Sequence, residues 1–319
     1  MSLKIFKTIM ATLIATIIAD LFSIQYSLTC GLIAMLSLQD TVLSTLNNAK
    51  KRLYIACLAL GLSSLLFFVF GFYFWVWGLF LFVFVPMTYY LKGQIALVPS
   101  CVLVGHLYTL QSTDYAVLLN EFAILSIGIL TASIINSYMP KKDKDIAELK
   151  QRIEEHLSVA LTQLAILLNA QISSGDTATT NIAHSIQHTL YADLIKAETL
   201  ILNERDNQVF HKQSDYNVSY ILMRKQQYTL LSYMFTYVRP VNVHQKEHVI
   251  YLFEKTAQQV TEWNTAETLI QDIEQCYTTL KDAPLPQTRA EFEERAMLFQ
   301  LLNDLERFLN VKKDFILNL

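Results

Sequence analysis

The stretch Asn47–Gly61, NNAKKRLYIACLALG, sets three consecutive cations, at 50–52, directly against a long apolar run. No charged residue follows until Lys92, so the uncharged run is 39 residues long. A helix needs about 20 residues to cross the ~30 Å hydrocarbon core of a membrane. The run is nearly twice that length, which predicts two membrane-spanning helices joined by a turn near Gly71.

The composition divides the chain into two physically different parts. The whole chain of 319 residues is 53% hydrophobic and 17% charged, whereas soluble domains carry about 25% charged residues. The part through Lys144 has a net charge of +4 and the rest −7, and seven of the eight glycines lie at or before Gly128. We therefore expect a membrane domain over 1–140 and a cytoplasmic domain over 141–319. The acidic second part argues against nucleic acid as a partner, because nucleic-acid binding needs a basic face.

Six apolar segments are predicted to span the membrane, over 5–22, 27–45, 53–71, 73–91, 94–110 and 116–138. The first segment could also be read as a signal peptide, but it lacks a clear cleavage site and more apolar segments follow it, so a retained span is favoured. The second segment has a short apolar part and contains Asp40, so a re-entrant piece is the alternative. The fold class expected is all-α.

The positions of the basic residues favour six spans with both termini in the cytoplasm. In that topology every Lys and Arg of the membrane part lies on the inner side: Lys4, Lys7, Lys50, Lys51, Arg52, Lys92, Lys141, Lys142 and Lys144. The outer connections, near 23–26, 71 and 111–114, hold none. Such a bias is typical of a correct membrane topology. We therefore expect a multi-pass protein of the cell membrane.

Four of these cations, Lys50, Lys51, Arg52 and Lys92, are candidates for a function. As anchors they would hold the ends of the spans at the cytoplasmic surface of the bilayer. They could also draw small organic anions toward a cytoplasmic entrance, and the two roles are compatible.

Three ionisable residues are predicted near the outer ends of their spans. Asp20 closes the first span, His106 lies in the outer third of the fifth, and Glu121 lies in the sixth beside Asn120. Ionisable residues inside a membrane are costly and often functional. A carboxyl group away from water binds a proton more readily, so the three are candidates for proton transfer. The alternative is that they lie hydrated and inert at the interface.

The six spans resemble the bacterial aromatic acid exporter family, which belongs with the fusaric-acid-resistance-like membrane proteins. The resemblance rests on the order of short motifs: Lys7-Thr8; Ser37, Leu38, Gln39 and Thr41; Lys51-Arg52; Gly128; and Asn136 followed by Pro140. It implies export of aromatic carboxylates and a cytoplasmic helical tail. The chain departs from the pattern where Asp40 replaces a common Pro and Glu121 a common Arg. These departures put a shared anion-binding mechanism in doubt.

The second part reads as an all-α bundle. In 145–168 the apolar residues Ile146, Leu149, Ile153, Leu157, Leu161, Leu164 and Leu168 recur at three- and four-residue steps, as on one face of a helix. The helix is expected to break at Gly175. Further amphipathic helices are predicted over 178–207, 215–238, 244–262, 265–281 and 287–317.

Two histidine pairs, His184 with His188 and His244 with His248, have spacings that can hold zinc on a helix. The second pair matches an HxxEH motif, but no third ligand or cleft is evident, so solvated helix faces are the favoured interpretation. No phosphate-binding loop or nucleophile elbow appears. We expect no enzyme activity, metal or cofactor.

Three classes of function remain open from the sequence. The favoured one is a secondary transporter that exports small organic acids, and the predicted proton-transfer residues make coupling to protons an option. The second is a membrane scaffold or sensor whose tail binds partners, and the third is a membrane enzyme. Small residues on the third span, Ala56, Ala59 and Ser63, allow close helix contact, from which we expect a homo-oligomer, such as a dimer, in the bilayer.

Overall fold

The computed structural model describes residues 3–138, 140, 142–170, 177–208 and 215–318. Over these residues the chain is helical and contains no strand, which confirms the all-α prediction. It divides into two compact units: Met1–Lys141 with Asn203–Phe210, and Lys142–Leu202 with His211–Leu319. The predicted break at Gly175 and the predicted inner cation Lys141 lie outside the described residues.

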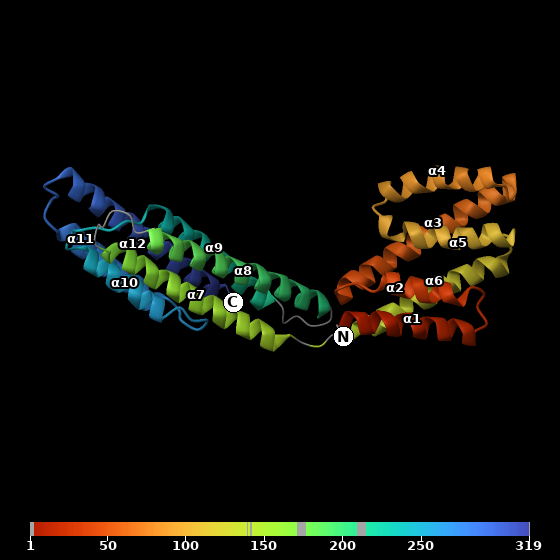
Figure 1. Cartoon of the computed structure of the whole chain (residues 1–319), viewed down its shortest axis with the longest axis horizontal. Helices are drawn as coiled ribbons and strands as arrows, with labels where there is room; N and C mark the ends of the chain where they lie inside the picture. Colours follow the sequence, from red (N-terminus) through yellow and green to blue (C-terminus); the bar gives the residue numbers. More distant parts are fainter. Residues whose placement is uncertain (1–2, 139, 141, 171–176, 209–214, 319) are drawn as a thin grey trace. The chain divides into compact units, whose positions relative to one another are not determined.

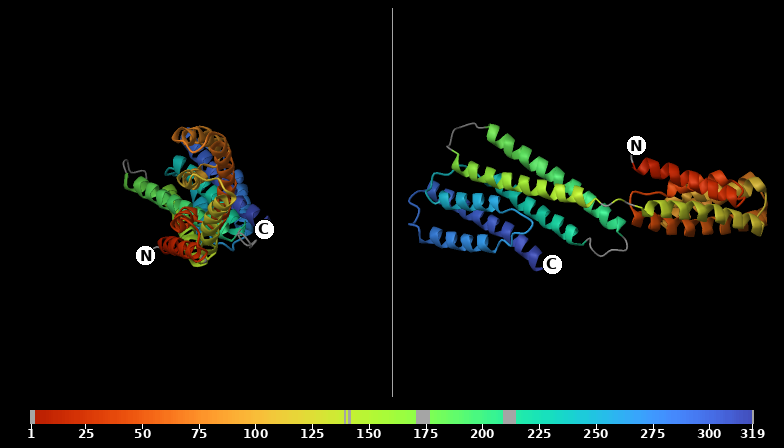
Figure 2. Two further views of the ribbon diagram at one scale, coloured as in Figure 1. Left: turned by 90° about the vertical axis from the view of Figure 1, so that its right-hand side faces the viewer. Right: turned by 90° about the horizontal axis from the view of Figure 1, so that it is seen from below.

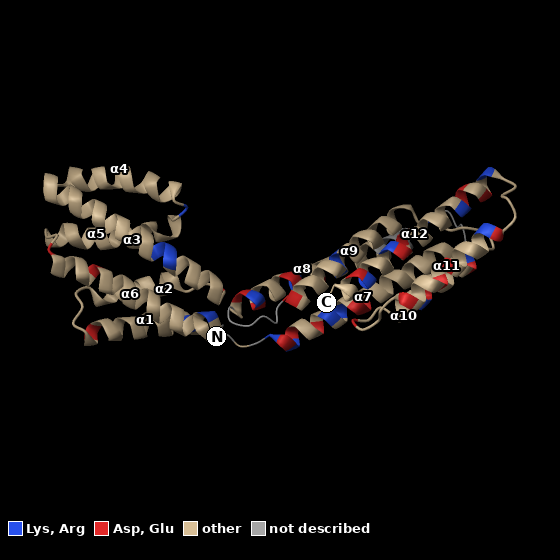
Figure 3. Cartoon of the chain, turned by 180° about the vertical axis from the view of Figure 1, so that it is seen from behind, with Lys and Arg blue, Asp and Glu red and all other residues tan. Residues whose placement is uncertain are grey.

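The first unit contains six α-helices and one short 3-10 helix (Figures 1 and 2). They are α1 (Leu3–Leu21), α2 (Ser27–Ser37), α3 (Val42–Phe70), α4 (Phe74–Tyr90), η1 (Gln94–Ala96), α5 (Leu97–Leu110) and α6 (Tyr115–Ser137). By length and composition α3 and α6 could each cross a membrane, while α2, α4 and the segment 94–110 are shorter apolar helices. Figure 3 shows how few charged residues these helices carry.

Small residues bring α1, α2 and α6 close together. Ala11, Ala15 and Ala19 recur every four residues on α1 and are fully buried, which forms a flat face of the kind that lets helix backbones approach. A side chain at Gly128 of α6 would come within 2.8 Å of the Cys30 carbonyl oxygen on α2. These three helices therefore pack through backbone contact at sites where larger side chains would not fit.

The turn predicted near Gly71 is confirmed, whereas the predicted end of the second segment is wrong. Gly71 has a φ of 78° between α3 and α4, a conformation that glycine adopts without steric cost. The second segment was expected to continue to residue 45, but α2 ends at Ser37. Thr41 then caps α3, because its hydroxyl accepts from the Ser44 N–H at 3.2 Å. The cations at 50–52 consequently lie within α3 and not ahead of it.

The second unit is built from α7 (Asp143–Asn169), α8 (Thr177–Asn207) as far as Leu202, α9 (Asp215–Tyr237), α10 (Lys246–Gln258), α11 (Glu267–Asp282) and α12 (Arg289–Leu317). The five helices from α8 onward begin and end within four residues of the predicted ranges. All seven apolar positions predicted for the first tail helix are buried. They join a core with residues of the other helices, and charged residues cover the outer faces (Figure 3).

Candidate functional site

A cluster of polar groups in the first unit, called the outer cluster after the side of the membrane predicted for it, consists of Gln25, Tyr26, His106, Asn120 and Glu121. Glu121 lies on α6 and is fully buried. Its Oε2 is 2.8 Å from Nδ1 of His106 on α5, and its Oε1 accepts from the Asn120 amide at 3.3 Å. The carboxyl group thus has a partner on each oxygen.

The connection between α1 and α2 holds His106 in place. The Tyr26 ring stacks on the imidazole with centroids 4.1 Å apart and planes 11° from parallel. Tyr26 has a φ of 60°, which is uncommon for a residue with a side chain. Asn120 fixes the neighbouring backbone, because it accepts from Gln25 N at 3.0 Å and donates to Gln25 O at 3.3 Å. The imidazole is therefore oriented with Nδ1 toward Glu121.

Exposure differs among the three predicted proton-transfer residues. The His106 side chain keeps 13% of its surface exposed and that of Glu121 none. The imidazole is therefore the more accessible group of the pair. Asp20 is exposed at the end of α1, and it is not among the hydrogen-bond partners that the structure gives Glu121 and His106. The structure brings two of the three residues together.

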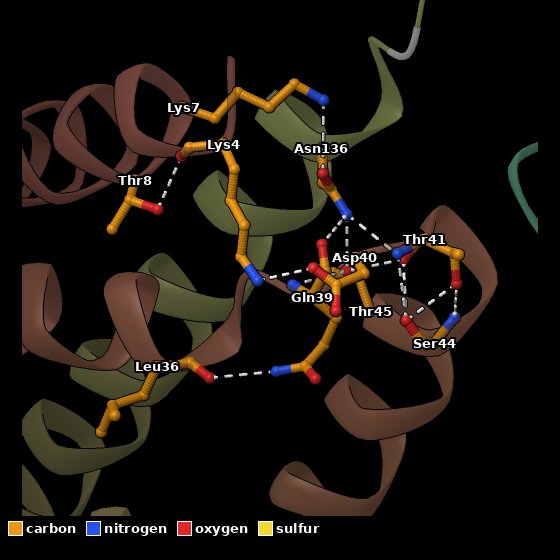
Figure 4. Close-up of polar contacts among 10 residues, drawn as sticks. All are labelled: Lys4, Lys7, Thr8, Leu36, Gln39, Asp40, Thr41, Ser44, Thr45 and Asn136. Carbon is orange, nitrogen blue, oxygen red and sulfur yellow. Dashed lines mark hydrogen bonds and ion pairs between the residues drawn. The ribbon is translucent and has the colours of Figure 1, made fainter. Parts of the chain in front are cut away.

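A second cluster, called the inner cluster after the side of the membrane predicted for it, lies at the opposite end of α6, where α2 and α3 are separated by four residues (Figure 4). Its residues are Lys7, Gln39, Thr41, Thr45 and Asn136. The Asn136 amide donates to Gln39 O at 3.1 Å, Thr41 O at 3.2 Å and Thr45 Oγ1 at 2.7 Å. Lys7 is buried and donates to Asn136 Oδ1 at 3.3 Å. The cluster supplies partners to backbone groups that the break in the helix leaves unpaired.

The four predicted basic residues fall into two groups. Lys50, Lys51 and Lys92 are exposed, as anchors at a membrane surface would be. Arg52 is 3% exposed. Its Nη2 donates to the Leu36 carbonyl oxygen at 2.7 Å and its Nη1 to Ser37 Oγ at 3.2 Å. Arg52 thus reaches from α3 to the last turn of α2.

The histidine pairs of the tail do not form a metal site in the described part of the chain. His184, His188, His244 and His248 are all exposed. No group of three or more His, Cys, Asp or Glu side chains among the described residues is arranged to hold a metal ion. Both histidines of the HxxEH motif therefore lie on the surface of the second unit.

A buried charge network lies within the tail, between α7, α9, α12 and the α10–α11 connection. Arg224 is 1% exposed and donates to Glu154 Oε1 at 2.6 Å. Lys150 donates to Glu262 at 2.7 Å and Lys312 donates to the Glu262 carbonyl oxygen at 2.6 Å. Although burial opposes it, the hydrogen bonds from Lys150 and Tyr216 lower the pKa of Glu262. A cavity of about 430 Å³ adjoins Lys150, Glu154 and Glu262.

Several of these residues could not be identified from the sequence. Tyr26 and Gln25 are ordinary loop residues there, and they gain their role only because a distant helix brings His106 and Asn120 to them. Lys7 and Asn136 belong to the motifs of the resemblance, but their contact joins positions 129 residues apart. No local pattern predicts such a contact.

Comparison with known proteins gives two family matches, which lie one after the other along the chain. A family described as "Aromatic acid exporter family member 1" matches residues 1–139, and one described as "Putative aromatic acid exporter C-terminal domain" matches residues 143–313. The "Uncharacterized protein YqjA" of Bacillus subtilis (strain 168) is 27% identical over 291 residues, which are 90% of this chain and 87% of that protein. A crystal structure of a "putative membrane protein from Clostridium difficile 630" is 23% identical, with a TM-score of 0.41, over 54% of this chain and 99% of that one.

Proposed function

The chain belongs to the aromatic acid exporter family, and on that premise we propose that it exports small aromatic carboxylic acids from the cytoplasm in exchange for protons. It is a membrane protein, and the family consists of transporters and not of enzymes. The family description suggests the class of substrate. The proton coupling is inferred from the outer cluster.

The proposal includes six membrane crossings with both termini in the cytoplasm. At 1.5 Å per residue, the 11 residues of α2 cover only about 16 Å. The four residues after it, if extended, add about 13 Å, so the two together cover the ~30 Å hydrocarbon core. Non-helical backbone is tolerated at such a depth only where protein groups satisfy it. Asn136 and Thr45 do so here.

The observation that carries the proton coupling is the 2.8 Å contact between His106 and the fully buried Glu121. A buried carboxylate is costly unless it is paired or protonated. Histidine is the side chain whose charge changes most readily near neutral pH. In the proposed cycle His106 takes a proton from the outer side and passes it to Glu121. The protonated, neutral carboxyl group then permits the conformational change that releases the proton inside.

Replacement of Glu121 by Gln tests this role. The amide keeps the shape and hydrogen-bonding capacity of the side chain but cannot carry a proton. In vesicles containing the purified protein, we expect export of an aromatic acid driven by a pH gradient to fall to the background of empty vesicles. Glu121→Asp keeps the titrating group and is expected to retain part of the rate.

The matched control is Asp114→Asn, which removes an exposed carboxylate just before the start of the same helix. It is expected to leave the rate unchanged. If Glu121→Gln exports the acid at the normal rate while the protein is folded and present in normal amount, Glu121 is not the proton carrier.

A further inference from the structure

Arg52 is a buried cation whose neighbours among the described residues include no counter-ion. Both of its hydrogen bonds go to neutral oxygens at the end of α2, those of Leu36 and Ser37. Its Nε is buried and has no hydrogen-bond partner. None of the ion pairs found in the described part of the chain involves its guanidinium group.

Such an arrangement is costly for a structural role alone. Burial of a charge is strongly unfavourable unless an opposite charge or a full set of hydrogen bonds compensates it. A single donor would suffice for the Leu36 carbonyl oxygen, yet the chain buries a whole guanidinium group with one nitrogen unused. The unpaired Nε and the lack of an anionic side chain beside the guanidinium group among the described residues both favour a ligand that supplies a carboxylate.

The surroundings of Arg52 allow it to turn toward a ligand. The Leu36 carbonyl oxygen has a second donor, because Nε2 of Gln39 lies 3.4 Å from it. Ser37 Oγ donates to the Ile33 carbonyl oxygen at 2.6 Å and keeps that bond without Arg52. Neither group loses its last partner if the guanidinium group moves.

We propose that Arg52 binds the carboxylate of the exported acid at the cytoplasmic end of the membrane unit, an assignment that rests on the proposed function. The planar fork of a guanidinium group matches a carboxylate with two parallel hydrogen bonds. Glu121 and Asn136 are 15 residues apart on α6, which is about 22 Å along a helix. The substrate carboxylate would then bind beside the last turn of α2, at Arg52, and the transported proton at Glu121 on α6.

The test measures benzoate export by vesicles as a function of benzoate concentration. Arg52→Gln is expected to raise KM for benzoate at least tenfold while the maximal rate stays within about threefold of wild type. Lys144→Gln is the control, because it removes an exposed cation from the first turn of α7, outside the four candidate cations, and it should leave KM unchanged. A role confined to holding α2 in place would lower the maximal rate or the amount of folded protein and leave KM as it is.

If Arg52→Gln does not fold, Arg52→Lys tests whether Arg52 binds the substrate carboxylate. Lysine keeps the charge and one bond to Leu36 but has no fork, so KM for benzoate should still rise several-fold. An unchanged KM in the folded Arg52 variants would overturn the inference while the exporter function stands. If wild-type vesicles export neither benzoate nor other aromatic acids, it is the proposed function that fails.

Discussion

The contact between Glu121 and His106 joins two groups that can share one proton. If the imidazole is protonated, the pair is a salt bridge, and if the carboxyl group is protonated, it donates to the neutral ring. Glu121 is not an isolated buried charge in either state. In the proposed cycle the Tyr26 ring, whose centroid lies 4.1 Å from that of the imidazole, would keep the imidazole in position during proton transfer. The transfer between the two groups would then require little movement of side chains.

Lys312 on α12 predicts a pH dependence of the stability of the tail. Burial, followed by the nearby charge of Arg224, lowers the pKa of Lys312 from its ordinary value of 10.5 to about 8. The folded tail therefore binds this proton more weakly than the unfolded chain does. The free energy of unfolding of the tail is lowered by this difference in proton binding. The reduction is fully present below pH 8 and disappears as the pH rises from 8 toward 10.5. The contribution of Lys312 should thus become more favourable with rising pH in that interval.

Lys312→Met removes the titration and approximately preserves the buried volume. The unfolding temperature of the wild type and of the variants can be followed by the loss of helical circular dichroism. We expect the unfolding temperature of the wild type to rise relative to that of the variant between pH 8 and 10.5. Lys313→Met, at the partly exposed neighbouring position, should run parallel to the wild type. Parallel curves for Lys312→Met as well would contradict the assigned pKa.

At the scale of elements, the break between α2 and α3 has a local and a distant cause. The local cause is the Thr41 cap, which the sequence shows as a threonine three residues before a serine. The distant cause is Asn136, more than 90 residues further along the chain. Hydropathy detects neither of them, because both are polar contacts and not part of the apolar pattern. The turn at Gly71 was predictable, since it follows from the length of the uncharged run.

The surroundings of Gly128 show that the backbones of α2 and α6 lie in close contact there. A Cβ added there would come within 2.8 Å of the backbone oxygen of Cys30, and backbone cannot move aside as a flexible side chain can. We expect Gly128→Ala to destabilise the first unit by roughly 1–3 kcal/mol, as overpacking does. The measurement is the thermal unfolding of the purified protein in detergent.

Gly61 on α3 provides the control for that substitution. An added Cβ there meets nothing within 4 Å, and alanine favours a helix by up to about 1 kcal/mol over glycine. Gly61→Ala should therefore match or exceed the stability of the wild type. Equal stability of the two alanine variants would show that α2 and α6 are not in backbone contact.

At the scale of the whole chain, the sequence predicted the helices of the tail better than the polar clusters of the membrane unit. Helix periodicity is a local pattern, and seven of seven predicted positions on α7 are buried. The partners of Glu121 and Asn136 are set by packing between distant segments.

The structure also removes the reason for which a dimer was expected from the sequence. Ala56, Ala59 and Ser63 are buried within the unit and do not offer a contact between copies, so the dimer stays a prediction.

The proposed topology predicts the side of the membrane for each connection. Reporter fusions after Phe72 and Thr113 should be active outside the cell, and fusions after Asn48, Gly93 and Lys144 inside. The physical reason is the confinement of Lys and Arg to one side of the spans. An outside signal after Lys144 would contradict six crossings, and it would reverse the assignment of the outer and inner clusters.

The most direct test of the exporter account is the direction in which protons move when an aromatic acid leaves a vesicle. Vesicles are loaded with benzoate, their membrane potential is clamped, and the internal pH is followed with a dye. Exchange of the anion for a proton should acidify the interior at a rate that depends on the protein and is abolished by Glu121→Gln. Passive escape of the undissociated acid carries a proton outward and makes the interior more alkaline. Alkalinisation at the same rate with and without the protein would contradict proton-coupled export.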